Sequence, residues 1–192
     1  MTMDKEQIDK AIERRRVEES MRGEFEATVS VRVDRYLQVK PHGIVPYTYF
    51  ASPLAQCSLL YRDGHFYGCI ALAQAVAEAL VKYICRKKRI RPGRSFEKNV
   101  DSLAAKAFIS QDLKGILLKI WENRDDYHHL NLGIEADIAK LEQIALEKVS
   151  FLVGAISTVF DFTMIEGKLA PKYPEYWDTK GPLTQVFLNL ER

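Results

Sequence analysis

Apolar residues recur at helical spacing through the middle of the chain. Leu113, Leu117 and Trp121 follow one another at four-residue intervals, which places them on one face of a helix. Similar spacing continues in the neighbouring segments, and turn residues such as Gly64 and Gly133 separate them. The pattern predicts a bundle of helices over Pro53–Tyr61, Phe66–Lys88, Phe96–Phe108, Gln111–Asn123 and Ile134 to about Met164.

The segment from Cys69 to Cys85 is the most apolar part of the chain. Gln74, Glu78 and Lys82 interrupt it at every fourth position and form one narrow polar stripe. Because the segment is short and carries charges, we expect no membrane span here. It is predicted to be the central helix of the bundle.

The two ends of the chain follow other patterns. Asp4–Arg22 is dense in charges of both signs and predicts a helix, whereas Thr28–Val39 fits a strand by its alternation and a helix by its spacing. In the tail, the strand-like segment Thr184–Leu190 could pair with Val29–Val39 or wrap a partner subunit. We divide the chain into an N-terminal extension (1–50), a helical bundle (51–166) and a C-terminal tail (167–192) that packs on the bundle or on a partner.

Composition narrows the class of protein. The chain has 192 residues, 47% of them hydrophobic, and a formal net charge of +2, which suits one domain with a core and gives no overall basic field. Its charged N-terminus lacks the apolar stretch of a secretory signal, and Cys57, Cys69 and Cys85 lack the spacing of a zinc site. We expect a cytoplasmic protein with reduced cysteines and without metal or cofactor.

The sequence lacks glycine-rich phosphate loops, which argues against P-loop and Rossmann nucleotide sites.

The run from Arg124 to His129 is the strongest candidate for chemistry. Arg124 continues the apolar stripe of the preceding helix, where an unpaired guanidinium is costly to bury, so we expect Asp125, Asp126 or a phosphate beside it. Arginine holds phosphate oxygens, and imidazole exchanges protons near neutral pH. The run therefore combines phosphate binding with acid–base groups. The alternative is a solvated ion pair at a helix end with ordinary surface histidines.

Arg124 and His129, with a polar residue directly after the arginine, match the R-x4-H motif, and the chain resembles the HEPN family over about residues 52–162. The resemblance implies an all-α, up-and-down helical bundle, to which the flanks add a minor β element, and a metal-independent endoribonuclease with its site at a homodimer interface. It implies that Arg124 clamps the scissile phosphate, that His129 moves the proton of the ribose 2′-hydroxyl, and that Asp125 orients both. RNA or a nucleotide is then the ligand, and the role is that of a toxin or defence component with an antitoxin or regulatory partner. Other family members bind nucleotides or proteins without cleaving RNA, which is the alternative function.

The two neighbouring histidines compete for the catalytic role. In a straight helix His128 shares a face with Arg124, and His129 is rotated away. The motif favours His129, which requires the helix to bend or end near Asp125–Tyr127. We therefore assign His129 the proton transfer and keep His128 as an auxiliary residue.

Two further residues bear on this site. Asn131 occupies the position where many toxins of the family carry a tyrosine that an antitoxin modifies, so we do not expect that modification. Glu78 lies on the central helix, where its carboxylate could orient Arg124 or His129; alternatively it faces a water-lined edge.

Two surfaces are candidates for binding partners. The helix predicted from Ile134 to Met164 would be about 45 Å long, more than a small bundle needs, so its surplus could pack on a second chain. A basic segment that ends in a proline- and glycine-containing loop could hold RNA phosphates, although lysines and arginines at a helix end can also simply be solvated. Its residues are Arg86, Lys87, Lys88, Arg89, Arg91 and Arg94.

Overall fold

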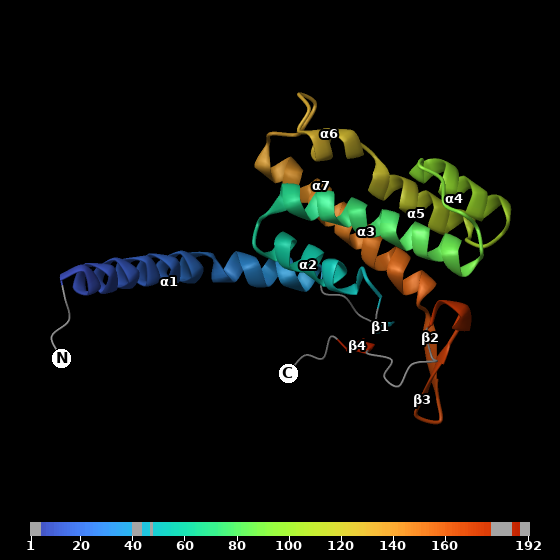
Figure 1. The fold of residues 1–192 in the computed structure, drawn as a ribbon, viewed down its shortest axis with the longest axis horizontal. Coiled ribbons are helices and arrows are strands. Elements are labelled where there is room, and N and C mark those ends of the chain that lie inside the picture. The colour runs from blue at the N-terminus through green and yellow to red at the C-terminus, as the bar shows by residue number, and fades with distance from the viewer. Residues whose placement is uncertain (1–4, 40–43, 47, 178–185, 189–192) are drawn as a thin grey trace.

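The computed structural model describes residues 5–39, 44–46, 48–177 and 186–188. Most of them are helical, and a small antiparallel hairpin follows the last long helix (Figure 1). The mostly helical fold with a minor strand element is therefore confirmed. The helices are α1 (Lys5–Val39), α2 (Ala51–Arg62), α3 (Phe66–Lys87), α4 (Phe96–Ala105), α5 (Gln111–Trp121), α6 (Arg124–His129) and α7 (Ile138–Val159).

Helix α3 is the central helix, as its apolar sequence predicts. Its buried side chains run from Phe66 to Cys85, and it packs against α2, α4, α5, α6 and α7. Ala73 and Ala77 are both 0% exposed, and their small side chains let the neighbouring helices approach closely. By length and hydropathy alone α3 could cross a membrane, contrary to our expectation from its charges. In the structure it lies among the other helices, and 56% of its most apolar window is buried.

Short polar side chains fix the start of three helices. Ser110 Oγ accepts a hydrogen bond from the backbone N–H of Leu113 (3.1 Å) at the start of α5. Ser95 caps α4 in the same way, and Asp137 caps α7. These oxygens satisfy N–H groups that have no partner within the helix itself.

Helix α7 is shorter than its sequence pattern predicts. It begins at Ile138 and ends at Val159, so its 22 residues span about 33 Å instead of 45 Å. The residues expected at its C-terminal end form strand β2 (Phe162–Ile165), which pairs with β3 (Lys168–Pro171). Glu166 and Gly167 both have positive φ (50° and 74°), the geometry of a type I′ turn that matches the twist of a two-residue hairpin. This turn ends the helical segment despite the helical spacing around it.

Helix α1 is continuous over 35 residues, so Thr28–Val39 is helical and the strand alternative is wrong. Its N-terminal part extends away from the bundle (Figure 1), and residues 5–27 are exposed. Ion pairs one turn apart support this exposed part of α1, which lacks the packing that stabilises the other helices. They join Lys10 to Glu6, Arg14 to Glu18 and Arg15 to Glu19.

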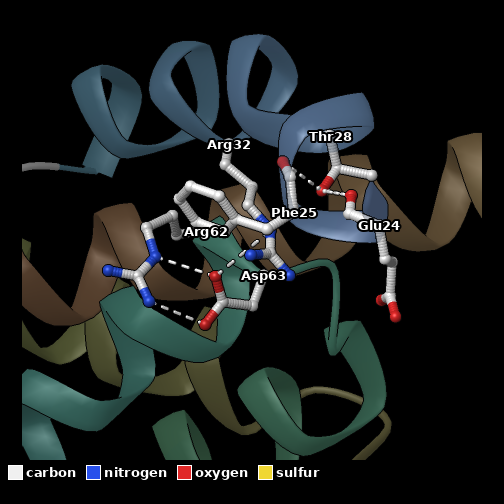
Figure 2. Close-up of polar contacts among 6 residues, drawn as sticks. All are labelled: Glu24, Phe25, Thr28, Arg32, Arg62 and Asp63. Carbon is white, nitrogen blue, oxygen red and sulfur yellow. Dashed lines mark hydrogen bonds and ion pairs between the residues drawn. The ribbon is translucent and has the colours of Figure 1, made fainter. Parts of the chain in front are cut away.

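Arginines attach the C-terminal part of α1 to the bundle. Arg35 donates two hydrogen bonds to the carboxylate of Glu142 on α7 (2.8 and 3.0 Å). Arg32 of α1 and Arg62 of α2 both approach Asp63 (3.7 and 2.8 Å), which follows α2, as Figure 2 shows. Arg62 is the main reason that the pKa of Asp63 is lowered. The carboxylate therefore stays charged and links the two helices.

A second pair of short strands joins the segment after α1 to the C-terminal tail. β4 (Val186–Leu188) pairs antiparallel with β1 (Ile44–Pro46). The tail therefore pairs with the N-terminal flank, but not with Val29–Val39 as one alternative had it. Before β4, a single 3-10 turn (Pro174–Tyr176) brings Tyr176 and Trp177 into the core, where both are 4% exposed. This part of the tail packs on its own bundle.

Candidate functional site

The motif lies on a short helix of its own. Helix α5 ends at Trp121, and Asn123 adopts a left-handed conformation (φ 58°), after which α6 begins at Arg124. Asparagine is among the residues that tolerate this conformation. The helix therefore breaks before Arg124, and the expected bend at Asp125–Tyr127 is wrong. Leu130, also left-handed (φ 51°), ends α6.

Two buried polar side chains hold the junction between α5 and α6. Gln74 of α3, which is 0% exposed, donates to the carbonyls of Ile120 (3.1 Å) and Glu122 (3.2 Å). Lys148 of α7, 6% exposed, donates to the carbonyls of Lys119 (2.5 Å) and Glu122 (3.0 Å). The last carbonyls of a helix have no partner within it, so these donors fix where α5 ends.

Burial lowers the pKa of Lys148, although Glu122 and Glu147 act in the opposite direction. Sequence reasoning missed this residue. The signal was present, because Lys148 lies seven residues after Leu141 and four before Leu152 on the apolar face of α7. A lysine at a core position of an amphipathic helix needs buried acceptors.

Arg124 is oriented by an aromatic stack and a carboxylate. Its guanidinium lies over the Trp121 ring (5.4 Å to the centroid), and Trp121 in turn stacks on Phe96 (4.2 Å, 13° between planes). Nη1 donates to Asp125 (2.9 Å). Arg124 Nε is buried and has no hydrogen-bond partner among the described residues. Of the two carboxylates expected beside Arg124, Asp125 is the one that pairs with it among the described residues, and Nε makes no hydrogen bond there.

The two histidines lie on different sides of α6. Because α6 is regular from Arg124 to His129, His128 shares the face of Arg124. His129 is rotated about the helix axis by about 100° from His128. Both histidines are exposed to solvent. The pKa of His128 is lowered, first by partial desolvation and then by the charges of Arg124 and His129, while a hydrogen bond with the backbone of Ala71 and the charge of Glu78 raise it. His128 is therefore predominantly neutral at neutral pH and can accept a proton.

The other predicted residues play supporting parts. Asn131 Nδ2 donates to the carbonyl of Asp125 (3.3 Å) and to Asp126 Oδ1 (3.4 Å), so it closes the C-terminal end of α6. Glu78 forms an ion pair with Lys82 on α3 (2.5 Å), and its negative charge raises the pKa of His128. The residue that contacts the junction from α3 is Gln74, one turn earlier.

A cavity of about 400 Å³ opens beside Arg124. Glu97, Glu122 and Asp125 line it together with Arg124, so three acidic residues and one arginine share its wall. The pKa of Glu97 is lowered mainly by its own backbone N–H and by Ser95, so it is charged at neutral pH. The remaining lining comes from Leu118, Trp121 and Asn123. A polyanion needs further positive charge nearby to enter such a pocket.

The residues of the basic segment differ in the ion pairs and aromatic contacts that they make. Lys88 pairs with Glu175 (2.7 Å) and lies over the rings of Phe108 and Tyr176, so it joins the tail to the bundle. Lys87 lies over the Tyr83 ring (5.4 Å). The rest are exposed arginines, none of which forms an ion pair with another described residue: Arg86, Arg89, Arg91 and Arg94. Of these, Arg86 lies 5.9 Å from the centroid of the Tyr49 ring.

The described residues give little support to a metal site or to a cysteine nucleophile. They contain no group of three or more His, Cys, Asp or Glu side chains that could hold a metal ion. Cys57, Cys69 and Cys85 are buried free thiols, and burial raises the pKa of each. A thiol with a raised pKa is a poor nucleophile at neutral pH.

No family model matches the chain, and neither the curated proteins nor the solved structures contain a match to it. Function must therefore be inferred from the site itself and from the motif that it carries.

Proposed function

We propose that the protein is a metal-independent endoribonuclease of the HEPN type. The observation that carries the proposal is the state of Arg124, which is stacked on Trp121, paired with Asp125 on one side and left with a buried Nε that has no partner among the described residues. A guanidinium fixed in this way is prepared to hold phosphate oxygens as their charge develops. His128 and His129 follow on the same short helix.

The proposed reaction is attack by a ribose 2′-hydroxyl on the adjacent phosphorus. The P–O bond to the 5′ oxygen of the next nucleotide breaks, and the products are a 2′,3′-cyclic phosphate and a free 5′-hydroxyl. His129 accepts the proton of the nucleophile, and an acid returns a proton to the leaving oxygen. We propose that a homodimer supplies base and acid from two copies of the motif. His128, which faces the side of Arg124, is the auxiliary candidate within one chain.

The test is cleavage of a labelled RNA in EDTA. Arg124→Ala and His129→Ala should each lose activity, while His65→Ala, which removes an exposed histidine in the turn before α3, should keep it. Circular dichroism and an unfolding curve establish that each variant is folded. Equal activity in all the proteins would identify a contaminating nuclease and reject the proposal.

The second candidate function is a noncatalytic module that binds a nucleotide or a partner protein through the same motif. The three carboxylates around Arg124 favour it, because they oppose the approach of a long polyanion. A wild-type protein that binds a nucleotide in calorimetry and leaves RNA intact would establish this function.

The cellular role can be tested separately. We propose a cytoplasmic toxin or defence component that an antitoxin or regulatory protein restrains. Expression of the wild type should then arrest growth, and His129→Ala should relieve the arrest. Growth that is equal with both proteins would exclude a toxin role and leave the biochemical proposal intact.

A further inference from the structure

We propose that the loop between α3 and α4 is a track for single-stranded RNA that leads into the Arg124 pocket. Arg89, Arg91 and Arg94 would contact successive phosphates, and Tyr49 beside Arg86 would stack a base at the far end. The inference rests on the proposed ribonuclease function for the chemistry at the end of the track, whereas strand binding by the loop can be tested without it.

The first support is that the arginines of the loop are available. Arg89, Arg91 and Arg94 are exposed, and none forms an ion pair with another described residue. Two exposed arginines of α1 differ, since Arg14 and Arg15 are each paired with a glutamate one turn later. An arginine without a carboxylate partner keeps its donors for a phosphate.

The second support is that the loop is held in one conformation. Arg89 is left-handed (φ 56°), and the N–H of Ile90 bonds to the carbonyl of Cys85 (2.8 Å), which together close the end of α3. Farther along, the buried side chain of Asn99 accepts from the N–H of Gly93 (2.7 Å) and donates to its carbonyl (3.1 Å). A fixed loop loses less conformational entropy when it binds a strand.

The third support is where the loop ends. Ser95 caps α4, and the next residue, Phe96, stacks on Trp121, which carries Arg124 on its ring. Glu97 lines the same cavity as Arg124. Arg94 therefore stands three residues before a wall of the pocket. The loop runs from the C-terminal end of α3 to the Arg124 pocket without an interruption.

Electrostatics explains why such a track is needed. The pocket holds three carboxylates and one guanidinium, so it repels a phosphate chain on its own. The segment 86–95 contains six basic residues and no acidic one. Its field attracts the strand, so that a phosphate can reach Arg124 against the local negative charge.

An exposed aromatic ring favours a single strand over a duplex. Tyr49 is 56% exposed, its hydroxyl donates to the carbonyl of Ala79 (2.9 Å), and Arg86 lies 5.9 Å from its ring centroid. A ring held in place next to positive charge is a stacking platform for an unpaired base. Bases in a duplex are already stacked and paired, so they cannot use it.

The experiment measures binding without cleavage. The probe is a fluorescent single-stranded oligoribonucleotide with 2′-O-methyl groups, which cannot undergo attack by the 2′ oxygen. The test variant is Arg91→Ala with Arg94→Ala, and the matched control is Arg14→Ala with Arg15→Ala, which removes the same charge from α1. We expect the test variant to bind about tenfold more weakly than the wild type. The slope of the logarithm of its binding constant against the logarithm of the salt concentration should become less steep by about 1.4, and the control variant should match the wild type in both.

Two comparisons complete the experiment. Arg91→Lys with Arg94→Lys should restore most of the affinity, and a duplex of the same sequence should bind more weakly than the single strand to the wild type. The proposed track would be rejected if the test variant and the control variant bound the probe with equal affinity. It would also be rejected if the duplex bound the wild type as tightly as the single strand does. Because the probe is not cleaved, these outcomes are independent of whether Arg124 and His129 cut RNA. A wild type that binds the probe through the loop but does not cleave RNA would reject the nuclease and keep the track.

Discussion

Arginines of the same protein are used in two ways, on the projecting part of α1 and around the Arg124 pocket. On α1, Arg14 and Arg15 find glutamates one turn later, and all four side chains are largely exposed. Near the pocket, Arg124 lies on an aromatic ring with an unused Nε, and Arg94 approaches from a loop that has no acidic residue. The difference is expected if Arg14 and Arg15 stabilise a helix and if Arg124 and Arg94 bind the ligand that we propose.

The largest effect should follow from removing the guanidinium of the pocket. If the nuclease proposal holds, Arg124→Ala should lower the single-turnover cleavage rate in EDTA by about 10²- to 10³-fold, as expected when one donor to a developing phosphate charge is lost. Arg15→Ala, which removes an arginine from α1, should leave the rate unchanged. A similar loss in both variants would remove the distinction between the two regions.

The next effect concerns the junction that positions Arg124. Lys148→Met should lower the free energy of unfolding by about 2 kcal/mol, because the carbonyls of Lys119 and Glu122 lose a buried donor. Urea unfolding measures the change, and Lys140→Met on the exposed side of α7 is the control. Replacement of a buried charge by an apolar side chain can also stabilise a protein. A more stable Lys148→Met variant would show that the lysine is not needed to end α5.

The sequence predicted most helices because their apolar spacing reflects burial in the core. Helices α2 to α5 lie close to their predicted ranges. The C-terminal limit of α7 was wrong, since the local turn at Glu166 and Gly167 decides it and helical spacing does not record turn geometry. The ambiguous Thr28–Val39 is helical, and its own pattern fitted both structures.

The candidate site was only partly visible in the sequence. Arg124 and its pairing with Asp125 could be expected, because a guanidinium on an apolar stripe needs an anion. The break of the helix before Arg124 could not be predicted, because it depends on hydrogen-bond donors from two other helices, Gln74 and Lys148. The contact between Phe96 and Trp121 joins segments 25 residues apart and likewise depends on the tertiary fold.

A smaller effect should appear in the pH dependence of stability. The pKa of His128 lies below its ordinary value of 6.5, first because of desolvation and then because of Arg124. The unfolded chain therefore takes up this proton at a higher pH than the folded protein, so stability falls as the pH drops through 6.5 toward the folded pKa. Urea unfolding between about pH 7.5 and pH 5 should show a shallower decline for His128→Gln than for the wild type. Equal slopes would mean that the pKa of His128 is the same in the folded and the unfolded protein, against the desolvation and the charge of Arg124 described here.

The smallest effect belongs to α1. Glu18→Gln with Glu19→Gln removes both partners of Arg14 and Arg15, and each ion pair one turn apart contributes about 0.3 kcal/mol to a helix. Amide hydrogen exchange in α1 should therefore speed up slightly at low salt, and high salt should remove the difference because these charges are exposed. Cleavage and strand binding should stay at the wild-type level. If the two freed arginines instead raise RNA affinity, then any unpaired arginine on this protein attracts RNA, and the loop's position beside the pocket would give it no special role.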